Sequence, residues 1–368
     1  MLAERVDRVR ERMTELGVDV LLVSAGPDLP YLTGYDAMPT ERLTMLVLPR
    51  DGDATLAVPR LEAPRVVERP QVFGLRSWDE TDDPVALVAD LAGRPSRVAI
   101  GDTTWARFVL DLQRALPGTD FIRGTEVVGP LRAVKDPGEV ETLRRAAAAA
   151  DRVAGDLQAG RIPLVGHSEA EVAAELGRRL LAEGHQRVKF AIVAAGENAA
   201  SPHHEPGDRV IRPGEVVLCD FGGTMLDDEG VGYNSDTTRC VHLGDPPAEL
   251  AAAYAVLHEA QRAAVAAATV GTPCQDVDAT ARKHIAEAGF GGRFIHRTGH
   301  GIGVEVHEDP YIVSGNTTPL ANGHAFSVEP GIYLPGRFGL RIEDIVVATD
   351  RGPVALNRSD HGLAVIDA

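Results

Sequence analysis

Acidic side chains interrupt three otherwise apolar stretches in the second half of the chain. Asp220 stands inside the run Val-Val-Leu-Cys-Asp-Phe, which otherwise predicts a fully buried strand. Asp236 follows a turn rich in Gly and Asp, so a hairpin would place Asp220 and Asp236 face to face. Glu329 and Glu343 flank a Pro- and Gly-containing turn and are predicted on adjacent strands. An unpaired buried carboxylate costs several kcal/mol, so each needs a cation or strong donors nearby.

A histidine lies between these two pairs of acids. His300 stands in Gly-His-Gly-Ile-Gly, whose close-set glycines let the backbone approach another element or a ligand. Four carboxylates and one imidazole, if they converge, suit a pair of divalent cations, Mn²⁺ or Co²⁺ more than a structural zinc. Cations about 3.5–4 Å apart can deprotonate a water and polarise a carbonyl, which indicates hydrolysis. A single strand aspartate is more often satisfied by amides or arginine, but five such residues are harder to explain that way.

The elements that must position these residues fall into two parts. All twelve histidines lie at or after His167, so imidazole chemistry belongs to the second part. The first part, residues 1–132, is predicted to be an α/β domain. Its strands are expected at 18–23, 43–48, 55–58, 72–75 and 98–100, and its helices at 2–16, 61–68, 84–92 and 105–116.

The second part, residues 133–368, is predicted to repeat one plan, two helices followed by strands. Asp136, Pro137 and Glu139 form a helix start, and Ser168 with Glu171 forms a capping box. A third start is expected at Thr272-Pro273-x-Gln275. The helices are expected at 137–160, 168–184, 246–269 and 273–288, with strands up to about 243 and 348. This order predicts an α+β domain with pseudo-twofold symmetry.

Composition limits the classes of function. The 368 residues contain 44% hydrophobic and 25% charged residues, which is typical of a globular protein with a sizeable core. A net charge of −17 argues against nucleic acid as a partner. No apolar run approaches the length of a membrane span, and the charged N-terminus does not resemble a signal peptide. Three cysteines without a C-x-x-C pair, Cys219, Cys240 and Cys274, indicate packing roles in a reducing compartment, so we expect a cytoplasmic protein.

With these residues in view, the chain resembles the M24 metallopeptidases, the superfamily of creatinase, prolidase and methionine aminopeptidase. Residues 131–140, Leu-Arg-Ala-Val-Lys-Asp-Pro-Gly-Glu-Val, resemble the start of its pita-bread catalytic domain, and the first part resembles its creatinase-type N-terminal domain. The similarity is strongest to the Xaa-Pro peptidases. It implies that five residues bind two divalent metal ions, most naturally Mn²⁺, with Asp236 and Glu343 as bridges: Asp220, Asp236, His300, Glu329 and Glu343.

The resemblance also implies roles for residues around the metals. His203, in Ser-Pro-His-His, is expected to touch the substrate, with His307 as its partner. Glu329 is expected to shuttle a proton, and Arg341 to order the carboxylates. Tyr233 and Arg239 flank Asp236 and are predicted to support it by hydrogen bonds. His204 is predicted to be a neighbour only, and the remaining eight are predicted at the surface or in packing: His167, His185, His242, His258, His284, His296, His324 and His361.

The implied activity is cleavage of the bond between an N-terminal residue and proline, in a dipeptide or a longer peptide. Prolidases commonly carry an arginine shortly after the second histidine, where Tyr311 stands here, so dipeptide preference is open and Arg337 is a speculative substitute. Two alternatives remain: a same-fold enzyme with other hydrolase or lyase chemistry on small molecules, and a non-catalytic binding protein. The resemblance also implies a homodimer.

Overall fold

The computed structural model describes residues 1–367, and they divide into two compact units. The first unit comprises Met1–Arg132 together with the hairpin tip Asp227–Gly232, and the second comprises Ala133–Leu226 and Tyr233–Ala368. None of the described helices combines the length and the apolarity that a membrane crossing requires.

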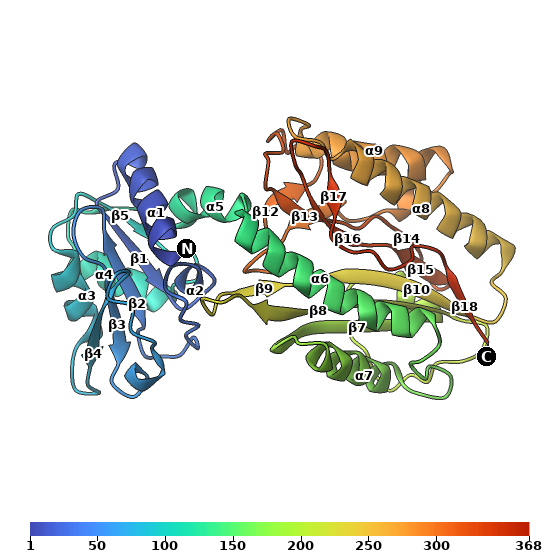
Figure 1. The fold of residues 1–368 in the computed structure, drawn as a ribbon, viewed down its shortest axis with the longest axis horizontal. Coiled ribbons are helices and arrows are strands. Elements are labelled where there is room, and N and C mark those ends of the chain that lie inside the picture. The colour runs from blue at the N-terminus through green and yellow to red at the C-terminus, as the bar shows by residue number, and fades with distance from the viewer. Residues whose placement is uncertain (368) are drawn as a thin grey trace. The chain divides into compact units, whose positions relative to one another are not determined.

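The first unit is built on one mixed six-stranded sheet in the order β4-β3-β2-β1-β5-β6 (Figure 1). Val20, Leu22, Val47 and Val98 belong to its core with Phe108 and Leu112 of the helical layer. Its strands are β1 Val20–Ser24, β2 Met45–Pro49, β3 Thr55–Pro59, β4 Gly74–Trp78, β5 Arg97–Ile100 and β6 Asp120–Arg123. Its helices are α1 Leu2–Leu16, α2 Asp28–Thr33, α3 Pro84–Ala92, α4 Ala106–Ala115 and α5 Thr125–Ala133. The predicted α/β class is confirmed.

One predicted helix of this unit is wrong. Residues 61–68 form only a short 3₁₀ turn at Ala63–Arg65. Val66 leaves the turn in an extended conformation, so the helix does not continue beyond Arg65. The sequence did not predict three short elements of this unit, α2, β6 and α5.

The second unit confirms the repeated order of two helices followed by strands. The first half contains α6 Pro137–Gln158, α7 Glu169–Ala182, β7 Arg187–Ala195, β8 Val216–Leu226, β9 Gly232–Asn234 and β10 Thr237–Leu243. The second half contains α8 Ala248–Ala267, α9 Cys274–Glu287, β11 Gly299–Gly301, β12 Glu308–Ile312, β13 Ala325–Val328, β14 Gly331–Leu334, β15 Phe338–Arg341, β16 Asp344–Val347, β17 Val354–Ala355 and β18 Ala364–Ile366.

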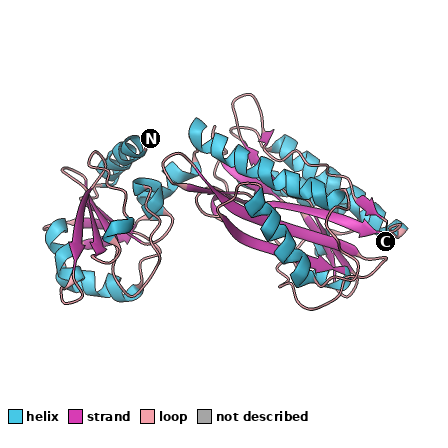
Figure 2. Cartoon of the chain, turned by 60° about the horizontal axis from the view of Figure 1, so that its bottom comes forward, coloured by secondary structure: helices cyan, strands magenta, loops and turns pink. Residues whose placement is uncertain are grey.

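Each half supplies one main sheet, and helices run along the strands (Figure 2). The first sheet has the order β18-β10-β8-β7 with β9 beside β8, and the second has the order β12-β11-β13-β16-β17. The C-terminal strand β18 pairs in parallel with β10, so it joins the sheet of the first half. Strands β14 and β15 form a separate hairpin.

Helix starts in this unit follow local side-chain chemistry in two of three predicted cases. Asp136 with Glu139, and Ser168 with Glu171, form complete capping boxes. The predicted start at Thr272 is wrong in its details, because Pro273 is the N-cap and no side chain caps α9. The Thr272 hydroxyl instead lies 2.9 Å from that of Thr269.

Candidate active site

A cavity of about 650 Å³ in the second unit brings the five predicted ligand residues together. Asp220 lies on β8, and Asp236 directly precedes β10. His300 lies at the centre of β11, Glu329 follows β13, and Glu343 precedes β16. The first sheet therefore supplies two of the five residues, and the second supplies three.

Strand alternation explains how Asp220 reaches the cavity. Val217, Cys219 and Phe221 on β8 join the core beneath α6 and α7. Val216 and Leu218 face the opposite core, which also contains residues of α8 and of the second sheet. Asp220 is two residues from Leu218 and four from Val216, so its side chain points to the same side of the strand as theirs.

The pairing of β8 with β10 brings Asp236 beside Asp220. Asp220 pairs with Thr238, two residues after Asp236. The predicted approach of the two aspartates is thus achieved by adjacent antiparallel strands, with β9 inserted between them in the sequence.

The second sheet positions the other three residues by register and by close backbone approach. Val328 pairs with Asp344, so Glu329 and Glu343 lie just beyond the paired ends of β13 and β16. Beside His300, a Cβ at Gly299 would lie 1.8 Å from the Ser327 carbonyl oxygen. The glycine spacing noted in the sequence is therefore required for β11 to fit against its neighbours.

Burial makes these carboxylates costly to ionise. Desolvation raises the pKa of Asp220, with Arg341 opposing and Glu329 adding to the effect. The pKa values of Asp236 and Glu343 are raised well above their usual range by burial and then by the other carboxylates. Glu329 differs: burial acts to raise its pKa, but the hydrogen bond and charge of His300, with the charges of His296 and Arg341, together outweigh burial and lower the pKa to about 2.

The donor set fits divalent cations. Ligand atoms of Asp236, His300 and Glu343 all lie within 4.8 Å of one another. The Oδ1 atom of Asp220 is buried without a hydrogen-bond partner. Over residues 1–367, Arg341 is the one arginine that forms an ion pair with any of the four carboxylates. A buried cluster with this excess of negative charge requires positive charge from elsewhere, which bound cations would provide.

The imidazole of His300 is oriented as a metal ligand requires. Its Nδ1 lies 3.1 Å from the carbonyl oxygen of Gly301, so a proton on Nδ1 is held by the backbone. Its Nε2 lies 3.1 Å from Glu329 Oε1 and 3.7 Å from Asp236 Oδ2. With Nδ1 protonated, the Nε2 lone pair points among the carboxylates.

Arg341 links the carboxylates to their surroundings. Its Nη2 donates to Asp220 Oδ2, its Nε donates to Thr238 Oγ1 at 3.0 Å, and its Nη1 donates to Tyr333 Oη at 2.9 Å. The Thr238 hydroxyl in turn donates to Glu343 Oε2 at 2.7 Å. Arg341, at the end of β15, thus contacts the first sheet at Asp220 and Thr238 and reaches Glu343 through Thr238.

Two histidines from the sequence motifs line the cavity, and a third does not. His203 and His307 belong to its wall. The ring of His307 lies 4.0 Å from that of His300, and burial with the nearby His300 lowers its pKa to about 4. His204 lies outside the lining residues, and its Nε2 is 2.7 Å from Glu169 Oε2, as expected for a neighbour only.

Sequence reasoning missed His296, which also lines the cavity. Its Nε2 lies 2.8 Å from Tyr333 Oη, next to Arg341. It was predicted at the surface or in packing because no motif surrounds it. The one signal in the sequence was its closeness to His300, four residues further on.

The predicted support of Asp236 by Tyr233 and Arg239 is wrong. Tyr233 donates its hydroxyl to Glu139 Oε1 at 2.8 Å. Arg239 donates to the Glu343 carbonyl oxygen at 2.7 Å and to Asp344 Oδ1 at 2.8 Å. Arg239 thus holds the backbone next to Glu343 rather than the carboxylate of Asp236.

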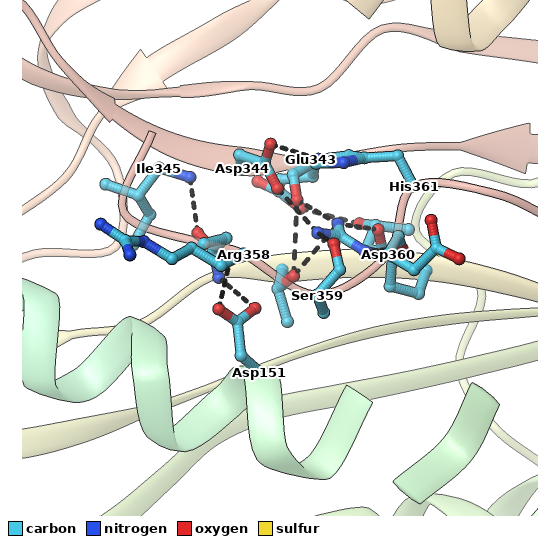
Figure 3. Close-up of polar contacts among 12 residues, drawn as sticks. Asp151, Glu343, Asp344, Ile345, Arg358, Ser359, Asp360 and His361 are labelled. Carbon is cyan, nitrogen blue, oxygen red and sulfur yellow. Dashed lines mark hydrogen bonds and ion pairs between the residues drawn. The ribbon is translucent and has the colours of Figure 1, made fainter. Parts of the chain in front are cut away.

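The C-terminal segment completes this support (Figure 3). Arg239 also donates to the carbonyl oxygens of Ser359 and Asp360, and His361 Nε2 lies 2.6 Å from Asp344 Oδ2. At the other end of the segment, the backbone amide of Arg358 donates to Asp151 on α6. The chain end is therefore bonded both to α6 and to the start of β16.

Arg337 does not line the cavity. Its Nη1 donates to Glu249 Oε1 at 2.8 Å in an exposed ion pair, so the speculative substitution for the missing arginine at Tyr311 is wrong.

Comparisons with known proteins agree with this geometry. The model of metallopeptidase family M24 matches residues 141–350, and that of the creatinase/prolidase N-terminal domain matches residues 5–134. The chain is 44% identical to the probable dipeptidase PepE of Mycobacterium tuberculosis over 99% of this chain and 96% of that protein. It is 36% identical to the Xaa-Pro dipeptidase of Lactobacillus helveticus over 98% of each.

A solved structure gives the same result. The prolidase of Thermococcus sibiricus superposes with a TM-score of 0.92 at 35% identity, covering 100% of this chain and 99% of that one. The expected creatinase-type domain followed by a pita-bread domain is therefore confirmed. The chain belongs to metallopeptidase family M24 and carries a creatinase/prolidase N-terminal domain ahead of its peptidase domain.

Proposed function

We propose that this metallopeptidase is an Xaa-Pro dipeptidase, which hydrolyses the bond before a C-terminal proline with two divalent cations, preferably Mn²⁺. Asp220, Asp236, His300, Glu329 and Glu343 would hold the cations. The observation that carries the proposal is the cavity itself, where four carboxylates and one imidazole share a wall with little compensating positive charge. The relatives named dipeptidase and Xaa-Pro dipeptidase support the substrate class.

Bound cations would supply an acidified water and polarise the carbonyl of the substrate. Glu329 would act as the proton shuttle, and the hydrogen bond from Ser327 Oγ to its Oε1 at 3.0 Å would orient its carboxylate. His307, neutral at neutral pH because of its lowered pKa, would hydrogen-bond the substrate together with His203 on the same cavity wall. Arg341 would keep Asp220 and, through Thr238, Glu343 in place.

A metal-exchange assay tests the activity. The protein is stripped with chelator, reloaded with Mn²⁺, Co²⁺ or Zn²⁺, and offered an Xaa-Pro dipeptide, an Xaa-Pro-Xaa tripeptide and a dipeptide without proline. We expect metal-dependent cleavage of the Xaa-Pro dipeptide. Cleavage confined to the tripeptide would make the protein an aminopeptidase, and no cleavage of any peptide would favour another chemistry or a binding role.

Replacement of one ligand tests the site. Asp236→Asn is expected to lower kcat/KM at least about 100-fold and to reduce the metal bound per chain, because ligand loss should exceed the effect of losing an outer contact. Activity and metal content are measured on the same preparation. Asp228→Asn, at an exposed position of the β8–β9 turn, is the matched control. An Asp236→Asn protein with full metal content and rate would refute the assignment.

We further propose a homodimer in the cytoplasm. The free, buried state of Cys219, Cys240 and Cys274 supports a reducing compartment, and the family resemblance supports the dimer. Sedimentation equilibrium tests the assembly, and a single species at the mass of one chain would refute it.

A further inference from the structure

The cavity has two kinds of wall. The carboxylates and His300 form one, and the other includes positive or neutral nitrogen groups: Lys189, His203, His296, Arg297 and His307. A dipeptide carries a negative carboxylate at its C-terminus. A cationic group on the second wall can pair with that carboxylate.

Arg297 is the guanidinium available for this purpose. It is half-buried in the cavity wall, and within residues 1–367 its guanidinium makes no ion pair and donates no hydrogen bond. By contrast, Arg341 is committed to Asp220, Thr238 and Tyr333, and Arg337 to Glu249. With no carboxylate bound to it, this guanidinium can donate two parallel hydrogen bonds to the carboxylate of a ligand in the cavity.

The Tyr311 ring holds this guanidinium by a cation–π contact. The Cζ atom of Arg297 lies 4.4 Å from the centre of the ring. The guanidinium is planar, so when it is held over the ring it can donate two parallel hydrogen bonds to a carboxylate. Tyr311 thus serves a carboxylate site indirectly, by orienting Arg297.

The backbone around Arg297 is held on both sides. Its carbonyl oxygen lies 2.7 Å from His296 Nδ1. The next residue, Thr298, donates from its amide and its hydroxyl to Asp278 Oδ1 at 3.0 and 2.7 Å. Arg282 from α9 bonds the carbonyl oxygen of His296. These bonds fix the backbone from which the Arg297 side chain extends.

We propose that Arg297, stacked on Tyr311, binds the free α-carboxylate of the proline residue and so restricts this site to dipeptides. This inference rests on the proposed Xaa-Pro activity and names the group that selects substrate length. Lys189 also lines the cavity, but its side chain is exposed and its ammonium cannot form the paired, planar contact of a guanidinium.

The test compares a dipeptide with its neutral analogue. The metal-loaded protein is assayed with Ala-Pro and with Ala-Pro-amide, which differ in the charge of the C-terminal group. We expect wild type to favour Ala-Pro by roughly 10- to 100-fold in kcat/KM, as for a hydrogen bond to a charged group. Arg297→Met should reduce this ratio to about one, Arg297→Lys should retain part of it, and Lys189→Met is the matched control that should keep it.

A binding measurement separates this inference from the proposed function. Calorimetric titration with L-proline and L-prolinamide reports carboxylate recognition without turnover, and wild type should favour proline by a ratio that Arg297→Met removes. If wild type hydrolyses neither substrate yet discriminates in binding, the proposed activity fails and the carboxylate site stands. Equal use of both substrates by wild type, or an unchanged ratio in Arg297→Met, would overturn the inference.

Discussion

His324 is a buried histidine outside the cavity, and its side chain is tied to the backbone through Nδ1, which accepts from the Ala321 amide. Burial, with a smaller effect of Lys135, lowers its pKa to about 4. The unfolded chain protonates this side chain near pH 6.5, so between pH 6.5 and 4 the unfolded state binds more protons. His324 therefore has no effect on stability above that window and destabilises the fold as the pH falls through it.

Replacement of His324 should flatten this part of the stability curve. From pH 7 to pH 5, the free energy of unfolding of His324→Asn should fall by about 2 kcal/mol less than that of wild type. Denaturant unfolding at a series of pH values measures the difference. His167 is exposed, so His167→Asn is the control and should keep the wild-type change with pH. A wild-type slope in His324→Asn would contradict the prediction.

Single residues differ in how well the sequence revealed them. The four acidic residues proposed as ligands were recognisable because a charged side chain in an apolar segment needs a partner, and His300 was recognisable by its close-set glycines. His296 and Arg297 carry no such conflict, because both occur in a polar stretch where the surface is the ordinary expectation. Tyr333 was not recognisable either, because its role comes from the hydrogen bonds that its hydroxyl makes with His296 and Arg341 in the folded chain.

At the scale of elements, β11 fits between β12 and β13 only because it is poor in side chains. Gly299→Ala should move His300, since the new Cβ would meet the Ser327 carbonyl oxygen and backbone cannot yield as a flexible side chain does. We expect a loss of about 1–3 kcal/mol of stability, together with weaker binding of Mn²⁺.

Chemical denaturation and calorimetric titration with Mn²⁺ measure the two effects. Gly292→Ala is the matched control, because a Cβ there has no atom within 4 Å. Unchanged stability and metal affinity in Gly299→Ala would show that β11 can shift without cost.

Elements were predictable where their signals are local. The capping boxes of α6 and α7 use residues three apart, and both formed as expected. The helix expected at 61–68 forms only one 3₁₀ turn, because the chain becomes extended at Val66. The pairing of β18 with β10 was not predictable, since it joins segments more than a hundred residues apart.

At the scale of the molecule, bound cations should stabilise the fold. The acidic cluster is costly without positive charge, so removal of metal with chelator is expected to lower Tm. Mn²⁺ at a free concentration of about 100 times its Kd adds about 2.7 kcal/mol to the free energy of unfolding. For a unit of this size, that corresponds to a rise in Tm of roughly 5 to 10 °C.

Scanning calorimetry of chelated and Mn²⁺-loaded protein measures this shift. The same comparison with Asp236→Asn is the control, because loss of a ligand should reduce the shift. Equal Tm values with and without Mn²⁺ in wild type would count against a metal site in this cavity.

The order of residues by itself indicated the two-part organisation, the repeated plan of the second part and the five residues proposed to bind metal. These follow from periodicity, local capping and the cost of a buried charge, which are all properties of short segments. Only the tertiary structure decided that Arg239 serves Glu343 and Asp344, that Arg337 pairs with Glu249, and that Arg297 is left facing the cavity. The reason is physical: a long side chain can reach several partners, and packing of distant segments selects among them.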